Sequence, residues 1–161
     1  MGIGLIGPIR PMGPITMKTL AKNNRATFDY DIQETLTAGM VLTGAEVKSV
    51  KNGNISLTGS YVTVSAGAVN LINAHIGPYK FAPNEGYNPT QTRKLLLNKR
   101  EINQLIGKEK GLVVIPLEIL QTGRGLVKIK IGVGRARKKT DKREYIKKRE
   151  AAREISKFIK L

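Results

Sequence analysis

The alternation of apolar and polar residues predicts a chain built mainly from short β-strands. Residues 60–64 alternate, a turn at residues 66–67 follows, and residues 69–76 return as the second arm of a hairpin. Residues 122–125, with the sequence TGRG, predict the turn of a second hairpin. The six expected strands are residues 28–34, 39–42, 60–64, 69–76, 112–120 and 126–133.

Two short helices are predicted from their N-terminal caps. Residues 43–46 read Thr-Gly-Ala-Glu, the pattern of a capping box, and the Asn-Gly pair at 52–53 is expected to end that helix. Residues 98–101 form a second cap-like start, and the apolar residues within 102–106 follow at i, i+3, i+4 spacing. We expect Gly111 to end this second helix.

These elements favour a mainly β fold, an OB-like antiparallel barrel of about six strands with two or three short helices and a basic C-terminal tail. Residues 77–92 are rich in Gly, Pro, Asn and Thr and are expected to form a loop. We divide the chain into a disordered leader at 1–19, the barrel at 20–134 and the tail at 135–161. Prolines at every third position of the leader exclude a helix there.

The C-terminal tail has the pattern of a narrow amphipathic helix. Asp141 is expected to cap it, with Glu144 at the third helical position. The apolar residues between 151 and 159 fall on one side of a 3.6-residue helix whose other positions are mostly charged, so the helix is marginal in water by itself. We hypothesise that the tail is disordered when free and becomes helical on a polyanion. Circular dichroism of residues 135–161 tests this, because a fully helical spectrum without RNA contradicts it.

The charge of the chain is concentrated in this tail. The 161 residues carry a formal net charge of +16. Residues 128–161 hold 14 basic and 4 acidic residues, a net charge of +10, which leaves +6 for residues 1–127. A weakly basic body with a strongly basic arm is typical of a protein that binds a polyanion.

The composition leaves little material for catalysis. The chain has no Cys and one His, so thiolate sites and two-histidine metal motifs are excluded. We interpret His75 as a structural or edge histidine, and no pair of carboxylates stands out. No uncharged apolar run reaches the ~18–20 residues that a membrane helix needs. We therefore predict no enzyme, no metal, no cofactor and no membrane partner, and a nucleic acid as the ligand.

Two lysines on one predicted strand suggest how RNA is bound. Lys128 and Lys130 alternate with apolar residues, so they share the outer face of the strand and are candidates for phosphate contacts. With five Tyr and three Phe, extensive base stacking is not expected, and recognition of RNA shape and backbone is favoured. Asn98 and Glu46 are interpreted equally well as capping residues or as RNA contacts.

Four blocks of sequence, in order, closely resemble the SmpB family, the bacterial SsrA-binding (tmRNA-binding) proteins. The blocks are residues 24–30 (NRATFDY), 38–49 (AGMVLTGAEVKS), 93–101 (RKLLLNKRE) and 141–150 (DKREYIKKRE). The resemblance covers about residues 20–161.

The resemblance implies a function in trans-translation. An OB-like barrel is expected to bind the tRNA-like domain of tmRNA at its elbow. The complex, with elongation factor Tu and GTP, is expected to enter ribosomes stalled without a downstream codon, where the tail folds in the empty mRNA channel. The resemblance also implies that the protein aids alanyl-tRNA synthetase in the alanylation of tmRNA. It further implies a monomeric protein that is located in the bacterial cytoplasm and associates with ribosomes.

The family's functional positions can be matched to this chain. The RNA-contacting positions match Asn23, Arg25, Leu96, Asn98 and Lys128, with Thr37 where the family often has a carboxylate. The positions for the decoding centre and mRNA channel match Arg137, Lys138, Asp141, Lys142, Arg143, Phe158 and Ile159, with Thr140 where an aromatic residue or His is frequent. Ala136 replaces a usual Gly.

Two other classes of function remain open from the residues. One is a general OB-type RNA-binding or ribosomal protein, and the other is a small nuclease or other RNA enzyme. The lack of metal-ligand carboxylates and histidine pairs disfavours the enzyme. The separate basic arm with its Asp-Lys-Arg block distinguishes a ribosome-rescue factor from a general RNA-binding protein, and co-purified RNA would separate the two.

Overall fold

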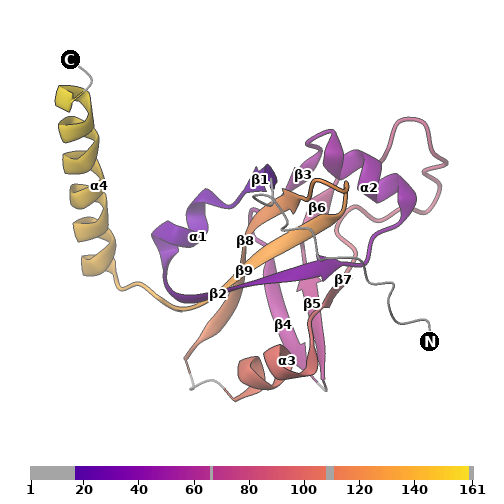
Figure 1. The fold of residues 1–161 in the computed structure, drawn as a ribbon, viewed down its shortest axis with the longest axis horizontal. Coiled ribbons are helices and arrows are strands. Elements are labelled where there is room, and N and C mark those ends of the chain that lie inside the picture. The colour runs from indigo at the N-terminus through magenta and orange to yellow at the C-terminus, as the bar shows by residue number, and fades with distance from the viewer. Residues whose placement is uncertain (1–16, 66, 108–110, 160–161) are drawn as a thin grey trace, which may run out of the picture.

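Six antiparallel strands close into a barrel in the computed structural model, which describes residues 17–65, 67–107 and 111–159 (Figure 1). Among these residues, the order around the ring is β8, β4, β5, β7, β2 and β9, and β9 pairs with β8 to close it. The ring strands are β2 (Tyr30–Met40), β4 (Tyr61–Ser65), β5 (Ala68–Ile72), β7 (Arg93–Leu96), β8 (Val113–Gln121) and β9 (Val127–Ala136). The predicted barrel of about six strands is confirmed.

Smaller elements surround this ring. Strand β1 (Lys18–Lys22) lies outside it and pairs with β8, and β3 (Ile55–Ser56) pairs with β6 (His75–Ile76) in a two-stranded sheet. The helices are α1 (Asn24–Asp29), α2 (Gly44–Lys51), α3 (Lys99–Ile106) and α4 (Lys139–Ile159). The expected disordered leader lies outside the described residues up to position 16, and its predicted end at residue 19 is wrong, because β1 begins at Lys18 and pairs with β8.

The core lies inside the barrel and follows the alternation of the strands. Alternate residues of β9 from Val127 to Val133 are buried, while Lys128 and Lys130 lie on the outer face, as their positions in the sequence predicted. The largest fully buried apolar side chains include Leu71, Ile76, Leu95, Ile119, Ile129 and Ile131. Apolar burial of this kind is the main stabilising contribution to such a domain.

Both predicted capping boxes are confirmed. The Thr43 side chain accepts a hydrogen bond from the Glu46 backbone at the start of α2, and the Asn98 side chain does the same for Glu101 at the start of α3, at 2.9 Å. The prediction that Gly111 ends the second helix is wrong. The helix ends at Ile106 because Gly107 already occupies the C-cap, where its N–H donates to the Asn103 carbonyl.

The predicted start of the first strand is also wrong. Residues 28–29 belong to α1, and the two strands expected at 28–34 and 39–42 are one long strand, β2. β2 stays continuous because it is paired with β9 from Tyr30 to Gly39, with one bulge between Ile32 and Glu34. A six-residue helix is too short to show an apolar period that sequence reading could detect.

A buried ion pair fixes the long loop at 77–92 to the barrel. The Arg93 Nε donates to a Glu46 carboxylate oxygen at 2.5 Å, and these side chains are only 1% and 2% exposed. The other Arg93 nitrogens donate to the Ala74, Pro89 and Gln91 carbonyls and to the Tyr87 hydroxyl. Glu46 is therefore both a helix cap and the counter-ion of Arg93, which ties α2, β7 and the loop together.

Helix α4 stands apart from the barrel (Figure 1). Over its 21 residues none is buried, and the described contacts between α4 and the barrel come from its first turns, next to α1. Asp141 does not cap the helix as predicted. The helix starts at Lys139, three residues before the predicted first helical residue, and the Asp141 carboxylate accepts a hydrogen bond from the Lys138 backbone at 3.3 Å. That the free tail unfolds stays a prediction, and the absence of burial within α4 supports it.

Candidate nucleic-acid interface

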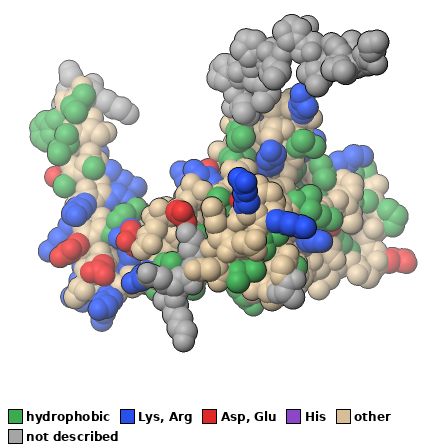
Figure 2. All heavy atoms as spheres, turned by 60° about the horizontal axis from the view of Figure 1, so that its bottom comes forward, with side chains coloured by type: hydrophobic (Ala, Val, Ile, Leu, Met, Phe, Trp, Pro, Cys, Tyr) green, Lys and Arg blue, Asp and Glu red, His purple; other side chains and the backbone are tan. Residues whose placement is uncertain are grey.

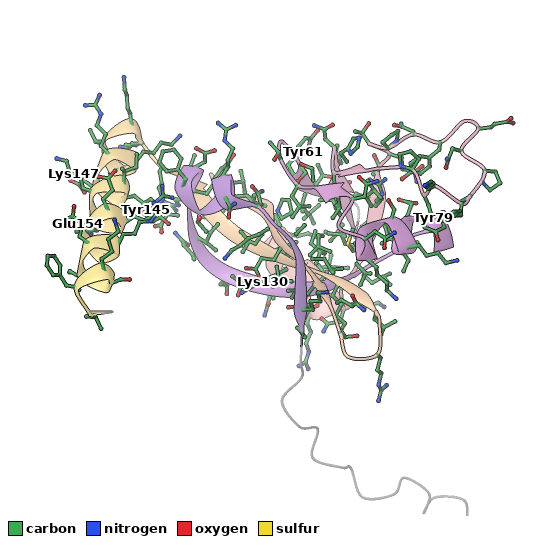
Figure 3. The ribbon with its side chains drawn as sticks, turned by 90° about the horizontal axis from the view of Figure 1, so that it is seen from above. Tyr61, Tyr79, Lys130, Tyr145, Lys147 and Glu154 are labelled. Atoms are coloured by element: carbon green, nitrogen blue, oxygen red, sulfur yellow. The ribbon has the colours of Figure 1, made fainter. Side chains whose placement is uncertain are left out.

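Three lysines lie on one outer face of the barrel, formed by β7, β2 and β9. We call the surface made by Thr37, Lys94, Leu96, Lys128 and Lys130 the lysine face. The strand register places Thr37 beside Lys130, and Gly39 between Leu96 and Lys128. Directly paired residues point to the same side of a sheet, so these side chains share one surface. Figure 3 shows Lys130 on the barrel, away from Tyr61 and Tyr79.

Gly39 lies at the centre of the lysine face and has no side chain. A Cβ placed on Gly39 would contact the Leu96 Cβ at 3.4 Å, which confirms that the Leu96 side chain covers this side of the sheet. Leu96 is 54% exposed although it is apolar. An exposed leucine between lysines offers an apolar contact to a ribose or base while the lysines reach phosphates.

A carboxylate borders the lysine face on β8. Glu118 pairs in register with Lys130 and, on its other side, with Lys22 of β1. The Lys22 Nζ lies 3.8 Å from a Glu118 carboxylate oxygen, and the lysine side chain is mainly exposed. Glu118 thus has its ion pair with Lys22, and the three lysines of the lysine face leave that surface with a net positive charge that suits phosphates.

Asn98 lies next to the lysine face, whereas Asn23 and Arg25 lie in a different place. Asn98 follows Leu96 by two residues and caps α3 with its side-chain oxygen. The Asn23 side chain donates to the Pro116 carbonyl at 3.0 Å, and its backbone N–H donates to the Leu117 carbonyl at 2.7 Å. Asn23 thus holds the start of α1 against β8, and the exposed Arg25 projects from that helix, 4.0 Å from the Asp29 carboxylate.

The beginning of the tail is attached to the barrel by Arg137. Its backbone N–H donates to the Asp29 carbonyl at 2.8 Å, and its Nε donates to the Tyr30 carbonyl at 3.2 Å. Its guanidinium also lies 3.8 Å from the Asp31 carboxylate and 4.6 Å from the centre of the Tyr145 ring. Arg137 therefore links β2, β9 and α4.

A second set of contacts supports the same junction. The Lys142 Nζ lies 3.1 Å from an Asp29 carboxylate oxygen and 5.6 Å from the Phe28 ring centre. The Phe28 and Tyr145 rings meet edge to face at 6.4 Å. Figure 3 shows Tyr145 between α4 and the barrel. We call Phe28, Asp29, Arg137, Lys142 and Tyr145 the tail junction.

The remaining tail residues predicted from the sequence are exposed. They are Lys138, Thr140, Asp141, Arg143, Phe158 and Ile159. Figure 2 shows Lys and Arg side chains along α4 and apolar side chains gathered near its C-terminal end. The structure thus separates the predicted tail residues into two groups, those at the tail junction and those displayed along an exposed helix.

The described residues offer no metal site and no membrane helix. Within 17–65, 67–107 and 111–159, no three His, Asp or Glu side chains are grouped so that they could hold a metal ion. In the same ranges, no helix is both long and apolar enough to cross a membrane. Every buried side-chain nitrogen or oxygen described has a hydrogen-bond partner.

Comparison with known proteins identifies the family. A profile described as SmpB protein matches residues 20–161, which is most of the chain. The chain belongs to the SmpB family. SmpB proteins are RNA-binding proteins and not enzymes.

Relatives in the SmpB family support the assignment over nearly the full chain. The SsrA-binding protein of Geobacillus kaustophilus (strain HTA426) is 47% identical over 145 residues, which cover 89% of this chain and 93% of that protein. The SsrA-binding protein of Coprothermobacter proteolyticus is 48% identical over 143 residues, covering 86% and 95%.

A solved structure shares the fold. It is described as "tmRNA-SmpB: a journey to the center of the bacterial ribosome", and its matching chain is 40% identical to this one. The two superpose with a TM-score of 0.62, over 74% of this chain and 85% of that chain.

Sequence reasoning missed two features of this SmpB chain. The pairing of Glu46 with Arg93 joins residues 47 positions apart, and no local pattern predicts it. The aromatic partner of Arg137 was also missed, because Arg137 precedes α4 and no helical spacing relates it to Tyr145.

Proposed function

We propose that this protein binds the tRNA-like domain of tmRNA through the lysine face and acts in trans-translation. The observation that carries the proposal is the lysine face itself, in a chain that belongs to the SmpB family. Its residues Leu96 and Lys128, with the adjacent Asn98, are positions that the family resemblance associates with RNA contact. The lysines supply the affinity for phosphates, and the exposed leucine and the amide supply contacts that depend on RNA shape.

We further propose that the tail acts on the ribosome and not in tmRNA binding. Helix α4 displays Arg143, Phe158 and Ile159 to solvent, and within the described ranges its contacts with the barrel lie near its first turns. A basic helix that is exposed beyond the tail junction suits a channel lined by RNA. On this proposal the tail enters the empty mRNA channel of a stalled ribosome and places Lys138, Thr140 and Asp141 near the decoding centre.

The other partners and the segment boundaries belong to the same proposal. Elongation factor Tu acts through the tmRNA complex, alanyl-tRNA synthetase acts on the bound tmRNA, and the protein works as a monomer in the bacterial cytoplasm. Because β1 begins at Lys18 and β9 ends at Ala136, residues 18–136 are proposed as the RNA-binding barrel, 137–161 as the ribosomal arm, and the residues before 18 as a leader. No step of this function requires chemistry by the protein itself.

The lysine face is tested by the salt dependence of RNA binding. Lys128→Gln should weaken binding of the tRNA-like domain of tmRNA, and it should lower the slope of log K against log salt by about 0.9, since one phosphate contact is lost. Lys147→Gln removes the same charge from α4 and should leave the slope unchanged. An unchanged slope for Lys128→Gln excludes this lysine from the interface.

The identity of the RNA is tested by co-purification from bacterial cells. We expect tmRNA to be enriched with the full chain, and enrichment of generic rRNA fragments without tmRNA contradicts the proposal. A chain ending after Lys138 keeps β9, which runs to Ala136, and most of the Arg137 contacts. It should retain tmRNA and lose peptide tagging on stalled ribosomes. Retained tagging would contradict the role of the tail.

A further inference from the structure

An exposed aromatic cluster with two lysines lies at the end of the molecule away from α4. Phe81, in the loop at 77–92, is 79% exposed. Its ring meets the Tyr79 ring edge to face, with centres 5.5 Å apart and planes at 68°. The Lys80 Nζ lies 5.7 Å from the Phe81 ring centre, and the Lys48 Nζ of α2 lies 5.5 Å from the Tyr79 ring centre. Figure 3 shows Tyr79 at the opposite end of the molecule from α4.

We infer that Tyr79 and Phe81, flanked by Lys48 and Lys80, form a stacking site for an unpaired nucleotide of RNA. We call these four residues the aromatic platform. An aromatic ring stacks on the face of a base, and an adjacent ammonium neutralises the phosphate of the same nucleotide. The inference deepens the proposed function and rests on its premise that the protein binds RNA.

The loop is held in place on both sides of the aromatic platform. On one side, the Ser49 hydroxyl donates to the Gly77 carbonyl at 2.5 Å, and the Gly77 N–H donates to the Asn54 carbonyl at 2.9 Å. A Cβ at Gly77 would overlap the Asn54 side chain, so a larger residue at this position would require that side chain to move.

On the other side, the Tyr87 hydroxyl donates to the Ile76 carbonyl at 3.0 Å and accepts from the buried Arg93 at 3.3 Å. The loop is therefore anchored before and after the platform, and its rings are presented with a reduced cost in conformational entropy on binding.

The positive charge around the rings indicates an anionic occupant. Lys48 and Lys80 bring two positive charges to the rings. Proteins that bind single-stranded nucleic acids use this arrangement, in which exposed aromatic side chains stack on bases and adjacent cations contact phosphates. The lysine face, on β7, β2 and β9, lacks aromatic residues, so the two surfaces offer different contacts: phosphates on one, and an unstacked base on the other.

A tryptophan reporter tests the aromatic platform. The chain has no Trp, so Phe81→Trp introduces a single indole at the proposed site. We expect a single-stranded RNA 12-mer of mixed sequence to quench its fluorescence, since a stacked base quenches an indole. Inorganic polyphosphate of matched charge has no bases and should not quench it. Ile106→Trp, at another exposed apolar position, should respond to neither.

Affinity gives a second measurement. Phe81→Ala should weaken binding of the RNA 12-mer about 5-fold or more, and Phe81→Tyr should bind within about 2-fold of the natural chain, because stacking needs a ring and not a phenylalanine. Phe81 is exposed, so equal urea midpoints of the variants should confirm that folding is unchanged.

Any of three outcomes overturns the inference. In the first, the fluorescence of Phe81→Trp stays unquenched while the RNA 12-mer is bound, and in the second, polyphosphate quenches it as strongly as RNA does. The third outcome is that Phe81→Ala binds the RNA 12-mer with the affinity of the natural chain. In the last case a protein partner becomes the alternative occupant of the platform. Selective binding of the tRNA-like domain of tmRNA by the natural chain is measured in parallel. Selective tmRNA binding without quenching at residue 81 would refute the aromatic platform and leave the proposed function standing. Quenching by RNA without selectivity for tmRNA would support the platform and contradict the proposed function.

Discussion

Replacing Glu46 by Gln should strongly destabilise the barrel. Glutamine keeps the length of the side chain and an oxygen for the capping box, so the start of α2 is preserved. The substitution removes the negative charge that faces Arg93, whose side chain is 1% exposed. A buried charge left without its counter-ion costs about 3–5 kcal/mol of the free energy of unfolding.

The contacts of Arg93 justify this magnitude. After the substitution, its remaining acceptors are the carbonyls of Ala74, Pro89 and Gln91 and the hydroxyl of Tyr87, all of them neutral. These groups accept from the two terminal nitrogens of the guanidinium, but they leave Nε, which donates to Glu46 in the natural chain, without that acceptor and do not balance the buried charge. The loss is a large share of the 5–15 kcal/mol that is typical of a folded domain. It corresponds to a fall in Tm of about 10 °C or more.

The measurement is urea unfolding at pH 7, followed by circular dichroism, with Lys22→Ala as control. The Lys22–Glu118 pair is 3.8 Å long and its lysine is 63% exposed, so breaking it should cost less than about 1 kcal/mol. The reasoning is refuted if Glu46→Gln loses no more stability than Lys22→Ala. A smaller m value in either variant would mean that its unfolding is no longer comparable with that of the natural chain.

Three further substitutions test other parts of the structure. A Cβ on Gly134 would overlap the Asp31 backbone, so Gly134→Ala should lower the free energy of unfolding by about 1–3 kcal/mol in urea, and an unchanged midpoint would show that β2 and β9 separate easily. Burial and the negative charge of Glu46 raise the Tyr87 pKa above 10.0, so the neutral phenol stabilises the fold below pH 10 and this contribution is lost as pH rises above it. The stability advantage of the natural chain over Tyr87→Phe should therefore be constant from pH 8 to 10 and shrink toward pH 11, and a constant difference throughout would contradict it. Tyr145→Ala removes the ring contacts at the tail junction, so amide exchange at residues 137–146 should accelerate, while exchange in β9 from 127 to 133 stays as slow as in the natural chain.

Local signals in the sequence predicted the elements that depend on neighbouring residues. The two capping boxes located the starts of α2 and α3 because their hydrogen bonds join residues three positions apart. The alternation in residues 126–133 predicted which side of β9 is buried, and thus that Lys128 and Lys130 lie outside. The four ordered blocks of sequence predicted the SmpB family, and the match of residues 20–161 to the SmpB profile confirmed it.

Features that depend on distant residues could not be predicted in this way. Thr37 and Lys130 are 93 positions apart and become neighbours only through the strand register, so the extent of the lysine face follows from the fold. The tail junction combines Phe28 and Asp29 with residues more than 100 positions later. Asp141 was assigned as a cap because it has the right side chain, but pairing of β9 through Ala136 and the Arg137 contacts place the helix start at Lys139.

The separation of α4 from the barrel makes the tail junction a pivot. With 21 residues and a rise of 1.5 Å each, α4 is a rod about 30 Å long. A rotation of about 20° at the tail junction would move the far end of the rod by about 10 Å, which is two helical turns. The few contacts of Arg137, Lys142 and Tyr145 therefore determine where Phe158 and Ile159 lie relative to the barrel. A small change in side-chain packing at one end of the tail becomes a large displacement at the other.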